Sequence, residues 1–368
     1  MNIEKLIQNI SSYVTPAIVY DLESIANTVK AIENDSKDID NIGFLFSVKA
    51  NRFSGVLNKI KDMNWGVDVA SISEFNIVKE IGFSDIYATS PSFKVEELDY
   101  MYEKGVIPDF NSISQIDLWC KNKSKKDCKN IGIRIKVEIP KELKHNTIYD
   151  ENGRFGMDAK DKLLMKVIEE NNIIVKQLHF HLGEIRNSNV IKATIKNLKD
   201  IINSFPYLEC INFGGGFTYL YSNVEERKKF WTCIKEFSNY IKITNKNIKF
   251  IFEPGMLITI GSGILVTSVL YLDKFNDDKY NAIVDASCWN LFSWSPIKVL
   301  KQIPERQGTK NKYMISGSSC YEADIFVSKG EFNRIEVGDR ICFAYGGAYV
   351  SSMMRNMHGI NYINEYIL

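Results

Sequence analysis

The sequence lacks the features that would place it in a membrane, on nucleic acid or outside the cell. No apolar run approaches the roughly 20 residues of a membrane span, and residues 1–10 have no apolar core of a secretion signal. A net charge of +1 gives no electrostatic basis for binding nucleic acid or a membrane surface. The 7 cysteines include no Cys-x-x-Cys pair, which is typical of reduced intracellular thiols. We therefore expect a cytoplasmic protein without nucleic-acid or membrane partners.

The chain does contain a long alternation of short apolar runs and amphipathic segments. In several of the segments, apolar residues recur at spacings of three and four, as on helices. These helical segments are residues 94–104, 158–170, 189–205 and 224–241. The apolar runs of strand composition are residues 44–49, 65–71, 85–90, 106–110, 131–138, 175–183, 210–216 and 249–255. Eight such units over about 250 residues predict a closed (β/α)8 barrel of the TIM type, with its active site at the carboxyl ends of the strands.

After Met256 the pattern changes to short β-rich runs separated by turns. Helical periodicity largely disappears, which indicates a second, mostly antiparallel β domain. The runs are residues 263–272, 280–285, 312–315, 324–327 and 339–344, and residues 17–20 form a similar run near the start. We therefore predict a barrel over residues 21–256 and a β domain over residues 257–368, joined by about residues 1–20. With 45% hydrophobic residues, the chain can form both cores.

Lys49 stands at the end of the first apolar run. A lysine projecting from the carboxyl end of a barrel strand can lose water and form a Schiff base with an aldehyde cofactor. Lysines beside strand ends are usually solvated, so the position alone does not assign this role.

Three other strand ends carry residues that suit the same chemistry. His179 and His181 point to the same side of the sixth strand because side chains alternate along a strand. The seventh strand ends in the glycines 214–216, which let backbone N–H groups approach a phosphate, although they also suit an ordinary tight turn. Glu253 places a carboxylate after the eighth strand, where a surface or ion-paired glutamate is equally compatible. An amine, an imidazole, a phosphate cradle and an acid are together what pyridoxal phosphate requires, and an acid at the ring nitrogen favours decarboxylation.

With these motifs, the chain resembles the fold-type III pyridoxal-phosphate-dependent decarboxylases that act on ornithine, diaminopimelate and arginine. The resemblance runs over almost the whole length, and its motifs occur in the family's order. They are Ser47-Val48-Lys49-Ala50-Asn51, Gly66-Val67-Asp68-Val69-Ala70-Ser71 with Glu74, Arg154-Phe155-Gly156, His181-Leu182-Gly183, Gly214-Gly215-Gly216-Phe217, Glu253-Pro254-Gly255, residues 317–324 and Gly347-Ala348-Tyr349. The family's architecture is a barrel followed by a β domain, in agreement with the pattern above.

The resemblance implies a role for each matching residue. Lys49 would form the Schiff base with pyridoxal phosphate, His181 would stack on the pyridine ring, and Glu253 would pair with the ring nitrogen. The remaining cofactor-binding residues would be Gly214, Gly215, Gly216 and Tyr349 at the phosphate, Gly255 in the motif of Glu253, and Asp68 and Arg134 around the cofactor.

Cys320 matches the cysteine that returns a proton to the α carbon in the family. There the cysteine comes from the neighbouring subunit, which implies a homodimer with shared active sites. The ordinary alternative is a small, inert core thiol, which is the common fate of a free cysteine.

The sequence departs from the family at the phosphate and at the substrate. Met256 stands where the family usually has an arginine, and Glu184 where it often has a serine, so two phosphate ligands are missing. Glu184 would have to turn away, pair with a cation such as Arg186, or lie beside an altered substrate pocket. Tyr321 replaces the acid that commonly follows the catalytic cysteine. The candidate substrate contacts are Tyr321, Glu322, Trp289 and Arg355.

These departures lead us to expect an unusual amino-acid substrate, such as a conjugate from a siderophore or antibiotic pathway. The alternatives are a diaminopimelate or ornithine decarboxylase proper and a non-catalytic regulatory homologue. A racemase on the same barrel would place arginine rather than Glu253 at the ring nitrogen. A metal-dependent hydrolase would use His179 and His181 as ligands, but the only other histidines are His145 and His358, and we expect no metal.

Overall fold

The computed structural model describes residues 2–122, 130–150, 152–244, 246–276, 279–292, 294 and 296–368, which form two compact units. The barrel unit comprises Val29–Val48 and Ile60–Leu257, and the β unit comprises Met1–Thr28, Lys49–Lys59 and Ile258–Leu368. Within the described ranges, no helix is both long and apolar enough to cross a membrane.

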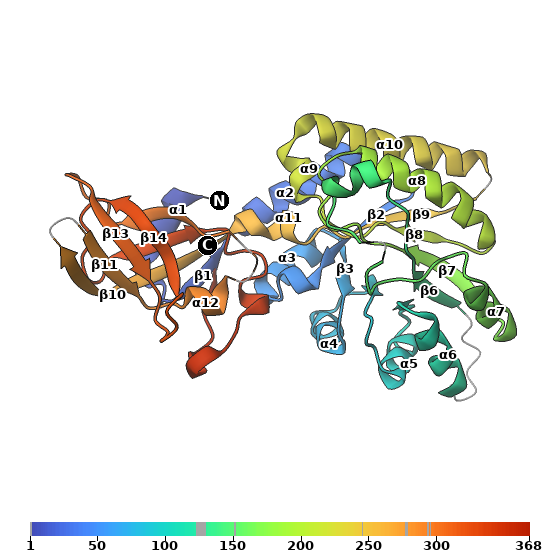
Figure 1. Cartoon of the computed structure of the whole chain (residues 1–368), viewed down its shortest axis with the longest axis horizontal. Coiled ribbons are helices and arrows are strands. Elements are labelled where there is room, and N and C mark those ends of the chain that lie inside the picture. The colour runs from blue at the N-terminus through green and yellow to red at the C-terminus, as the bar shows by residue number, and fades with distance from the viewer. Residues whose placement is uncertain are drawn as a thin grey trace. The chain divides into compact units, whose positions relative to one another are not determined.

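The barrel unit contains a sheet of eight parallel strands (Figure 1). They are β2 (Ile42–Ser47), β3 (Gly66–Val69), β4 (Ile86–Ala88), β5 (Asp109–Phe110), β6 (Asn130–Arg134), β7 (Ile174–His179), β8 (Cys210–Asn212) and β9 (Lys249–Phe252). Hydrogen bonds link them in the order β4-β3-β2-β9-β8-β7-β6-β5, and a parallel bridge between Thr89 and Asp109 joins the two edges. Each predicted run overlaps one of these strands, so the predicted (β/α)8 barrel is confirmed.

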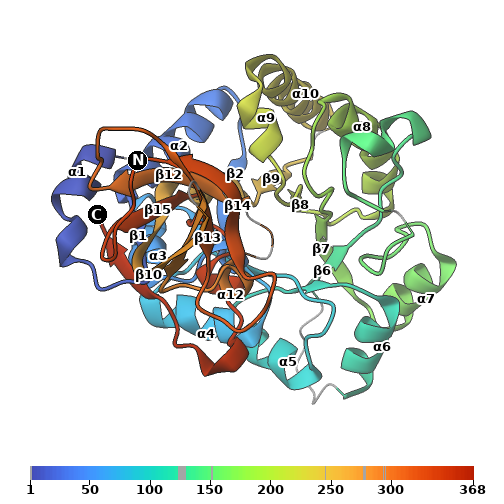
Figure 2. The same cartoon turned by 60° about the vertical axis from the view of Figure 1, so that its left-hand side comes forward.

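Helices follow the strands and surround the sheet (Figure 2). The helices of the barrel unit are α4 (Ile72–Ile81), α5 (Val95–Glu103), α6 (Ile113–Asn122), α7 (Lys162–Glu170), α8 (Asn189–Ile201), α9 (Thr218–Ser222) and α10 (Val224–Ile243). Along the sequence, α2 (Leu22–Ser36), α3 (Ser54–Asp62) and α11 (Met256–Thr259) pass from one unit to the other. The helices predicted at residues 94–104, 158–170, 189–205 and 224–241 are confirmed as α5, α7, α8 and α10.

Aromatic side chains fix which face of β8 and β9 points outward. Phe213 and Phe252 stack with their ring centroids 4.9 Å apart, and Phe252 also lies 5.2 Å from Trp231 of α10. Phe250 stacks 5.2 Å from Phe237 of the same helix. Because side chains alternate along a strand, the neighbours of these phenylalanines face the barrel interior.

The β unit is a second eight-stranded sheet, and most of its strand pairs are antiparallel, as predicted. Its strands are β1 (Ala17–Tyr20), β10 (Gly263–Asn276), β11 (Lys279–Val284), β12 (Lys298–Ile303), β13 (Asn311–Ser316), β14 (Ile325–Phe332), β15 (Arg340–Ala344) and β16 (Asn364–Ile367). The short helices α1 (Ile3–Gln8) and α12 (Cys288–Leu291) belong to the same unit. The order is β12-β15-β10-β11-β13-β14, and β1 pairs with β10 and β16. The sequence did not indicate β12 or β16, because neither is an apolar run: both mix charged and apolar residues.

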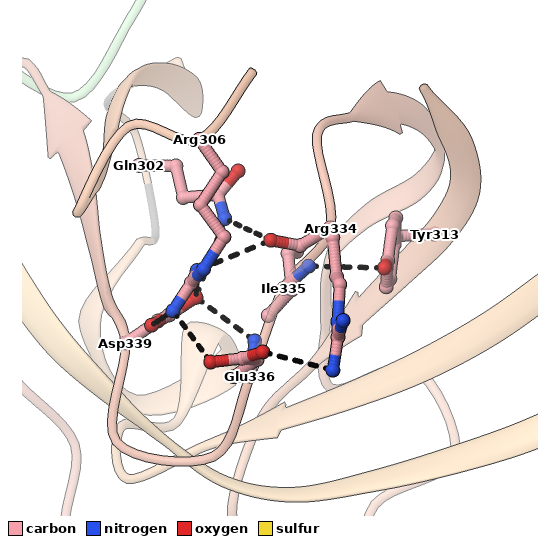
Figure 3. A network of polar contacts seen from close by, with 7 residues as sticks. All are labelled: Gln302, Arg306, Tyr313, Arg334, Ile335, Glu336 and Asp339. Carbon is pink, nitrogen blue, oxygen red and sulfur yellow. Dashed lines mark hydrogen bonds and ion pairs between the residues drawn. The ribbon is translucent and has the colours of Figure 1, made fainter. Parts of the chain in front are cut away.

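A network of charged side chains ties the end of β12 to the turn before β15 (Figure 3). The Arg306 guanidinium contacts both carboxylate oxygens of the buried Asp339 and donates to Glu336 at 2.8 Å. Gln302 Nε2 donates to the carbonyl of Arg334 at 2.9 Å. The buried carboxylate in this network therefore faces a cation directly, as a structural ion pair requires.

Candidate active site

Glu253 is the acid at the mouth of the barrel, where the carboxyl ends of the parallel strands meet. It follows β9 and is 2% exposed. Asn212, at the end of β8, donates from Nδ2 to Glu253 Oε1 at 2.5 Å and accepts from the Gly214 backbone N–H at 2.9 Å. The Glu253 backbone N–H donates to the Gly214 carbonyl at 2.8 Å. The side chain of Glu253, through Asn212, and the backbone of Glu253 are thus both hydrogen-bonded to the loop of residues 214–216 after β8, here called the glycine loop.

The glycine loop also holds His181. The Gly215 backbone N–H donates to His181 Nδ1 at 3.1 Å, so this nitrogen is an acceptor and carries no proton in this arrangement. Gly214 and Gly216 have φ values of +67° and +93°. A Cβ at Gly216 would lie 1.7 Å from the Gly183 carbonyl oxygen. Glycine is required here because the loops after β7 and β8 cross too closely for a side chain.

The Glu184 side chain is hydrogen-bonded to the first residue of α9, which follows the glycine loop closely. Its carboxylate accepts from the backbone N–H and the hydroxyl of Thr218, both at 3.1 Å. Burial raises the pKa of Glu184, while the hydrogen bonds from Thr218 and Tyr219 and the charge of Arg186 lower it. The structure therefore adds an arrangement that the sequence did not suggest, in which Glu184 engages backbone donors beside the glycine loop. The Arg186 guanidinium lies 5.0 Å from the ring centroid of Tyr219.

A layer of buried polar side chains lies inside the barrel, on the alternate strands β3, β5 and β7 and directly after β9. Its members are Asp68, Asp109, His179 and Glu253. Alternate strands of a (β/α)8 barrel contribute the side chains of one interior layer. Arg134, at the end of β6, is close enough for Glu253, Asp68 and Asp109 each to raise its pKa, while burial lowers it more strongly.

Asp109 was not recognised as a site residue from the sequence. Thr89 Oγ1 donates to its Oδ2 at 2.8 Å, and Gln177 Nε2 donates to its Oδ1 at 2.7 Å. A Cβ at Gly132 would lie 1.9 Å from Asp109 Oδ1, so glycine makes room for the carboxylate. Burial raises the pKa of Asp109 to about 7. The available signal was Gln177, a polar residue two positions before His179 and therefore on the same inward face.

Lys49 comes two residues after β2, and its backbone is held by the last part of the chain. Ser352 Oγ donates to the Lys49 carbonyl at 2.8 Å, and the Tyr349 backbone N–H donates to the Ala50 carbonyl at 2.8 Å. Asn51 Nδ2 donates to the Gly347 carbonyl at 2.9 Å. These bonds explain why Lys49–Lys59 groups with the β unit although it lies within the range predicted for the barrel. Two predicted site residues, the catalytic Lys49 and the cofactor-binding Tyr349, thereby lie on segments joined by hydrogen bonds.

Tyr349 has a φ of +58°, an unusual conformation for a residue with a side chain. Such backbone conformations occur most often at functional sites, where the surrounding structure maintains them. Its ring lies 5.2 Å from that of Trp294, centroid to centroid. The exposed side chain of Lys49 and the constrained backbone of Tyr349 thus lie on segments joined by hydrogen bonds.

Three of the four candidate substrate contacts form one cluster in the β unit. The rings of Trp289 and Tyr321 are 4.4 Å apart, and the Arg355 guanidinium lies 4.5 Å from the Trp289 ring centroid. Cys320 is exposed, and its backbone N–H donates to His358 Nδ1 at 3.3 Å. An exposed thiol beside this cluster differs from the inert core thiol that was the ordinary alternative. Glu322 is exposed two residues along the chain from Cys320.

The residues inside the barrel suit pyridoxal phosphate better than a metal ion. In the described part of the chain, no group of three or more His, Cys, Asp or Glu side chains is arranged to hold a metal. Glu253 is a buried carboxylate, the kind of group that pairs with a pyridine nitrogen, and the glycine loop leaves no room for side chains. Both features match the donor set that the cofactor requires.

Comparison with known proteins supports the same assignment. Residues 22–260 match the family described as pyridoxal-dependent decarboxylase, pyridoxal binding domain. The chain is 25% identical to carboxynorspermidine/carboxyspermidine decarboxylase of Campylobacter jejuni, over 88% of this chain and 85% of that protein. It is 24% identical to L-glutamyl-[BtrI acyl-carrier protein] decarboxylase of Niallia circulans, over 91% of this chain and 84% of that protein.

A solved structure shows the same fold. The diaminopimelate decarboxylase of Helicobacter pylori, in an I148L mutant complexed with L-lysine, superposes with a TM-score of 0.82 at 22% identity. The match covers 100% of this chain and 94% of that one. Both the barrel and the β unit therefore have counterparts in a decarboxylase.

Proposed function

The chain belongs to the pyridoxal-dependent decarboxylases, and from this premise we propose that Lys49, His181 and Glu253 hold pyridoxal phosphate for the decarboxylation of an amino-acid conjugate. The enzyme is a pyridoxal-phosphate-dependent amino-acid decarboxylase. When bound, the cofactor withdraws electrons from the α carbon, so that carbon dioxide can leave. The observation that carries the assignment of residues is the buried Glu253, fixed by Asn212 beside the glycine loop.

Each residue has a defined task at the cofactor. Lys49 would bond to the aldehyde, and Glu253 would hold a proton at the ring nitrogen. His181, kept in place by the Gly215 N–H, would lie against the ring. The glycines 214–216, Gly255 and Tyr349 would surround the phosphate, with Asp68 and Arg134 as polar neighbours. The carboxylate of Glu253 is suited to its task because burial strengthens its interaction with a positive charge.

Cys320 is the proposed donor that returns a proton to the α carbon. It is an exposed thiol, whereas Cys210, Cys288 and Cys342 are buried, and burial raises the pKa of each of those three thiols. We propose that the thiol acts in the active site of a second subunit, in a cytoplasmic homodimer. The exposed position of Cys320 supports donation to a substrate bound outside its own β unit.

The proposed substrate is larger than a simple amino acid, and its pathway would be a specialised one of the siderophore or antibiotic type. Trp289 and Tyr321 offer aromatic surfaces, Arg355 offers a cation, and Glu322 lies nearby in sequence. Such a surface suits an extended substrate with apolar and polar parts. The relatives named for carboxyspermidine and for an acyl-carrier-protein-linked glutamyl group support this substrate class. The second candidate is diaminopimelate, as in the H. pylori enzyme of the same fold.

The first experiment tests the covalent attachment. Pyridoxal phosphate is added to the wild type, to Lys49→Ala and to Lys160→Ala, an exposed control lysine. After reduction with borohydride, we expect the wild type and the control to retain the cofactor by mass spectrometry. Retention by Lys49→Ala would overturn the role of this lysine.

The second experiment tests the reaction and the shared site. We expect carbon dioxide release from one member of a panel of amino acids, carboxylated polyamines and acyl-carrier-linked amino acids. Lys49→Ala and Cys320→Ala, each inactive alone, should recover activity when mixed, because one hybrid site then contains both native residues. Absence of recovery between folded, exchanging subunits would contradict the shared site. Absence of release from every substrate would favour the non-catalytic homologue.

A further inference from the structure

His179 is a buried titratable residue to which the proposed function gives no task. We propose that His179 carries a positive charge between Asp109 and Glu253 and acts as a positioning residue that keeps Glu253 ionised. This inference rests on the proposed function, because its consequence depends on Glu253 holding the ring nitrogen. It extends the site to further residues of the interior layer that contains Glu253, which control where the proton of the ring nitrogen resides.

The geometry places His179 between two carboxylates. Its Nδ1 is 3.5 Å from Asp109 Oδ2, and its Nε2 is 3.7 Å from Glu253 Oε2. The three side chains are at most 3% exposed. Charges this deeply buried are screened little by water, so the state of the imidazole directly affects both acids.

The hydrogen bonds of Thr89 indicate whether Nδ1 of His179 carries a proton. The Thr89 hydroxyl donates its hydrogen to Asp109 Oδ2 at 2.8 Å. Its oxygen lies 3.3 Å from His179 Nδ1 and is therefore available as an acceptor. A proton on Nδ1 makes this contact favourable, whereas a lone pair there would face the Thr89 oxygen and the Asp109 carboxylate.

The Nε2 side leads to the same conclusion. This nitrogen faces an oxygen of Glu253, and Asn212 donates to the other oxygen of the same carboxylate. With Nδ1 protonated, a neutral ring would direct the Nε2 lone pair at a carboxylate oxygen, which is repulsive. Protons on both ring nitrogens remove the two repulsions, so the geometry favours the imidazolium.

The surrounding charges also favour a cation at this position. The ionisable groups next to His179 are Asp109 on β5, Glu253 after β9 and Arg134, its register partner on β6. Asp68 on β3 is close enough to Asp109 and Arg134 to raise the pKa of both. Three carboxylates thus face Arg134, and an imidazolium brings their charges closer to balance. No lysine or arginine of the described residues is buried to the same degree as these acids.

The surroundings of Asp109 decide which of the two groups holds a proton. Burial and the charge of Asp68 raise the pKa of Asp109 to about 7, against the hydrogen bonds from Thr89 and Gln177 and the charge of Arg134. A positive charge on His179, 3.5 Å away, opposes this rise, because a neighbouring cation favours the ionised carboxylate. Because both Asp109 oxygens accept hydrogen bonds from neutral donors, the ionised carboxylate suits Asp109 and the proton suits His179.

The consequence concerns the proton between Glu253 and the ring nitrogen. A positive charge beside a carboxylate weakens it as a base. With His179 charged, a proton shared by Glu253 and the ring nitrogen therefore resides on the nitrogen. With His179 neutral or absent, Glu253 becomes the stronger base and draws that proton away.

The first test uses the protein without cofactor. The chain has 4 histidines, so histidine labelled with 13C at Cε1 gives four resonances that single substitutions can assign. We expect the His179 resonance of the wild type to stay at the protonated position from pH 6 to pH 8. In Asp109→Asn and in Glu253→Gln, we expect its midpoint to fall by at least one pH unit. His145→Gln is the control, because His145 is exposed on Lys141–Asn146.

The second test follows the ring nitrogen with 15N-labelled pyridoxal phosphate. We expect its chemical shift to report a protonated nitrogen in the wild type and a loss of that proton in His179→Gln at pH 8. A purely structural role for His179 would leave this shift unchanged in any folded, cofactor-binding variant. An unchanged shift in His179→Gln would therefore overturn the inference.

The outcomes separate this inference from the proposed function. A neutral His179 in the wild type at pH 7, together with a protonated ring nitrogen, overturns the inference and leaves the role of Glu253 intact. An unprotonated ring nitrogen in the wild type overturns the proposed role of Glu253, and with it the consequence drawn for His179. Because the titration itself uses unsubstituted protein and substitutions serve only to assign the four resonances, these decisions do not depend on the folding of the Asp109 or Glu253 variants.

Discussion

Asp109 in the barrel and Asp339 in the β unit are both buried carboxylates, yet their hydrogen-bond donors differ in charge. Asp339 faces the Arg306 guanidinium through both oxygens. Asp109 accepts from Thr89 and Gln177, which are neutral. A buried acid bonded to an arginine keeps one protonation state and serves stability, whereas a buried acid held by neutral donors beside a histidine can share a proton with that neighbour. The difference separates a structural network from a site prepared for chemistry.

The largest effect, on turnover, should follow from Glu253→Gln, which removes the negative charge at the mouth of the barrel but keeps a side chain of the same shape. We expect turnover to fall by roughly 10²–10³-fold, the usual cost of removing one preorganised electrostatic contact. Stability should not fall, because the change removes one of several neighbouring carboxylates. The measurement is kcat on the identified substrate together with thermal unfolding, and Glu170→Gln, an exposed residue of α7, is the control. Turnover within threefold of the wild type would contradict the role.

For Arg306→Ala we expect lower stability and unchanged turnover, because the buried Asp339 then has no guanidinium to contact. Breaking a buried pair in this way costs about 3–5 kcal/mol of unfolding free energy. The matched control is Arg334→Ala in the same network, because the Arg334 side chain is 75% exposed and should cost less than about 1 kcal/mol. Denaturant unfolding measures both variants, and the folded protein should keep its activity. An equal loss of unfolding free energy in Arg306→Ala and Arg334→Ala would refute a special role of Arg306 as the partner of the buried Asp339.

The sequence predicted the barrel well because its signals are local. Each strand is an apolar run, and helices such as α8 and α10 show the spacing of three and four on their buried faces. Strand β12, Lys-Val-Leu-Lys-Gln-Ile, was missed because its residues are only partly buried and its charges hide the pattern. Alternation along β7 and beyond it also predicts that His179 and His181 follow one face.

The polar layer inside the barrel was less accessible from the sequence. Asp109 and Gln177, which are hydrogen-bonded, are 68 positions apart in sequence, and His179 and Thr89, which are in contact, are 90 positions apart. Nothing local distinguishes these residues from ordinary polar positions at strand ends. Glu184 illustrates the same limit, since its hydrogen bonds to Thr218 depend on how two loops cross. The assigned roles of Lys49 and Cys320 remain predictions, to be decided by the experiments above.

A smaller, pH-dependent effect should distinguish Asp109→Asn from the wild type. With Asp109 ionised beside a charged His179, the folded protein keeps the His179 proton above the ordinary pKa of histidine and binds more protons than the unfolded chain above about pH 6.5. Wild-type stability should therefore decrease as the pH rises above about 6.5, relative to the variant, in which His179 loses its proton at a lower pH. Denaturant unfolding of both proteins at pH 5 and pH 8 measures the change. A difference between the two proteins that does not vary with pH would contradict a charged His179 beside Asp109.

The smallest effect should come from Glu184, whose carboxylate accepts the Thr218 N–H beside the glycine loop. If the phosphate binds at this loop, an ionised Glu184 repels it, so Glu184→Ser should bind pyridoxal phosphate roughly tenfold more tightly, or about 1.4 kcal/mol. Burial raises the pKa of Glu184. Wild-type affinity should therefore decline as the pH rises and this carboxyl ionises, and Glu184→Gln should lose that dependence.

Titration with pyridoxal, which has no phosphate, is the matched control for the Glu184 variants. A gain in affinity for pyridoxal phosphate alone places Glu184 at the phosphate, because a general loosening of the loop would change the affinity for both ligands. An equal gain for both ligands would instead mean that Glu184 acts on the fold of the loop between β7 and α8. The comparison with Asp339 then extends to a third acid, the half-buried Glu184, whose partners are a backbone N–H and a hydroxyl and whose charge would oppose a phosphate at the neighbouring glycine loop.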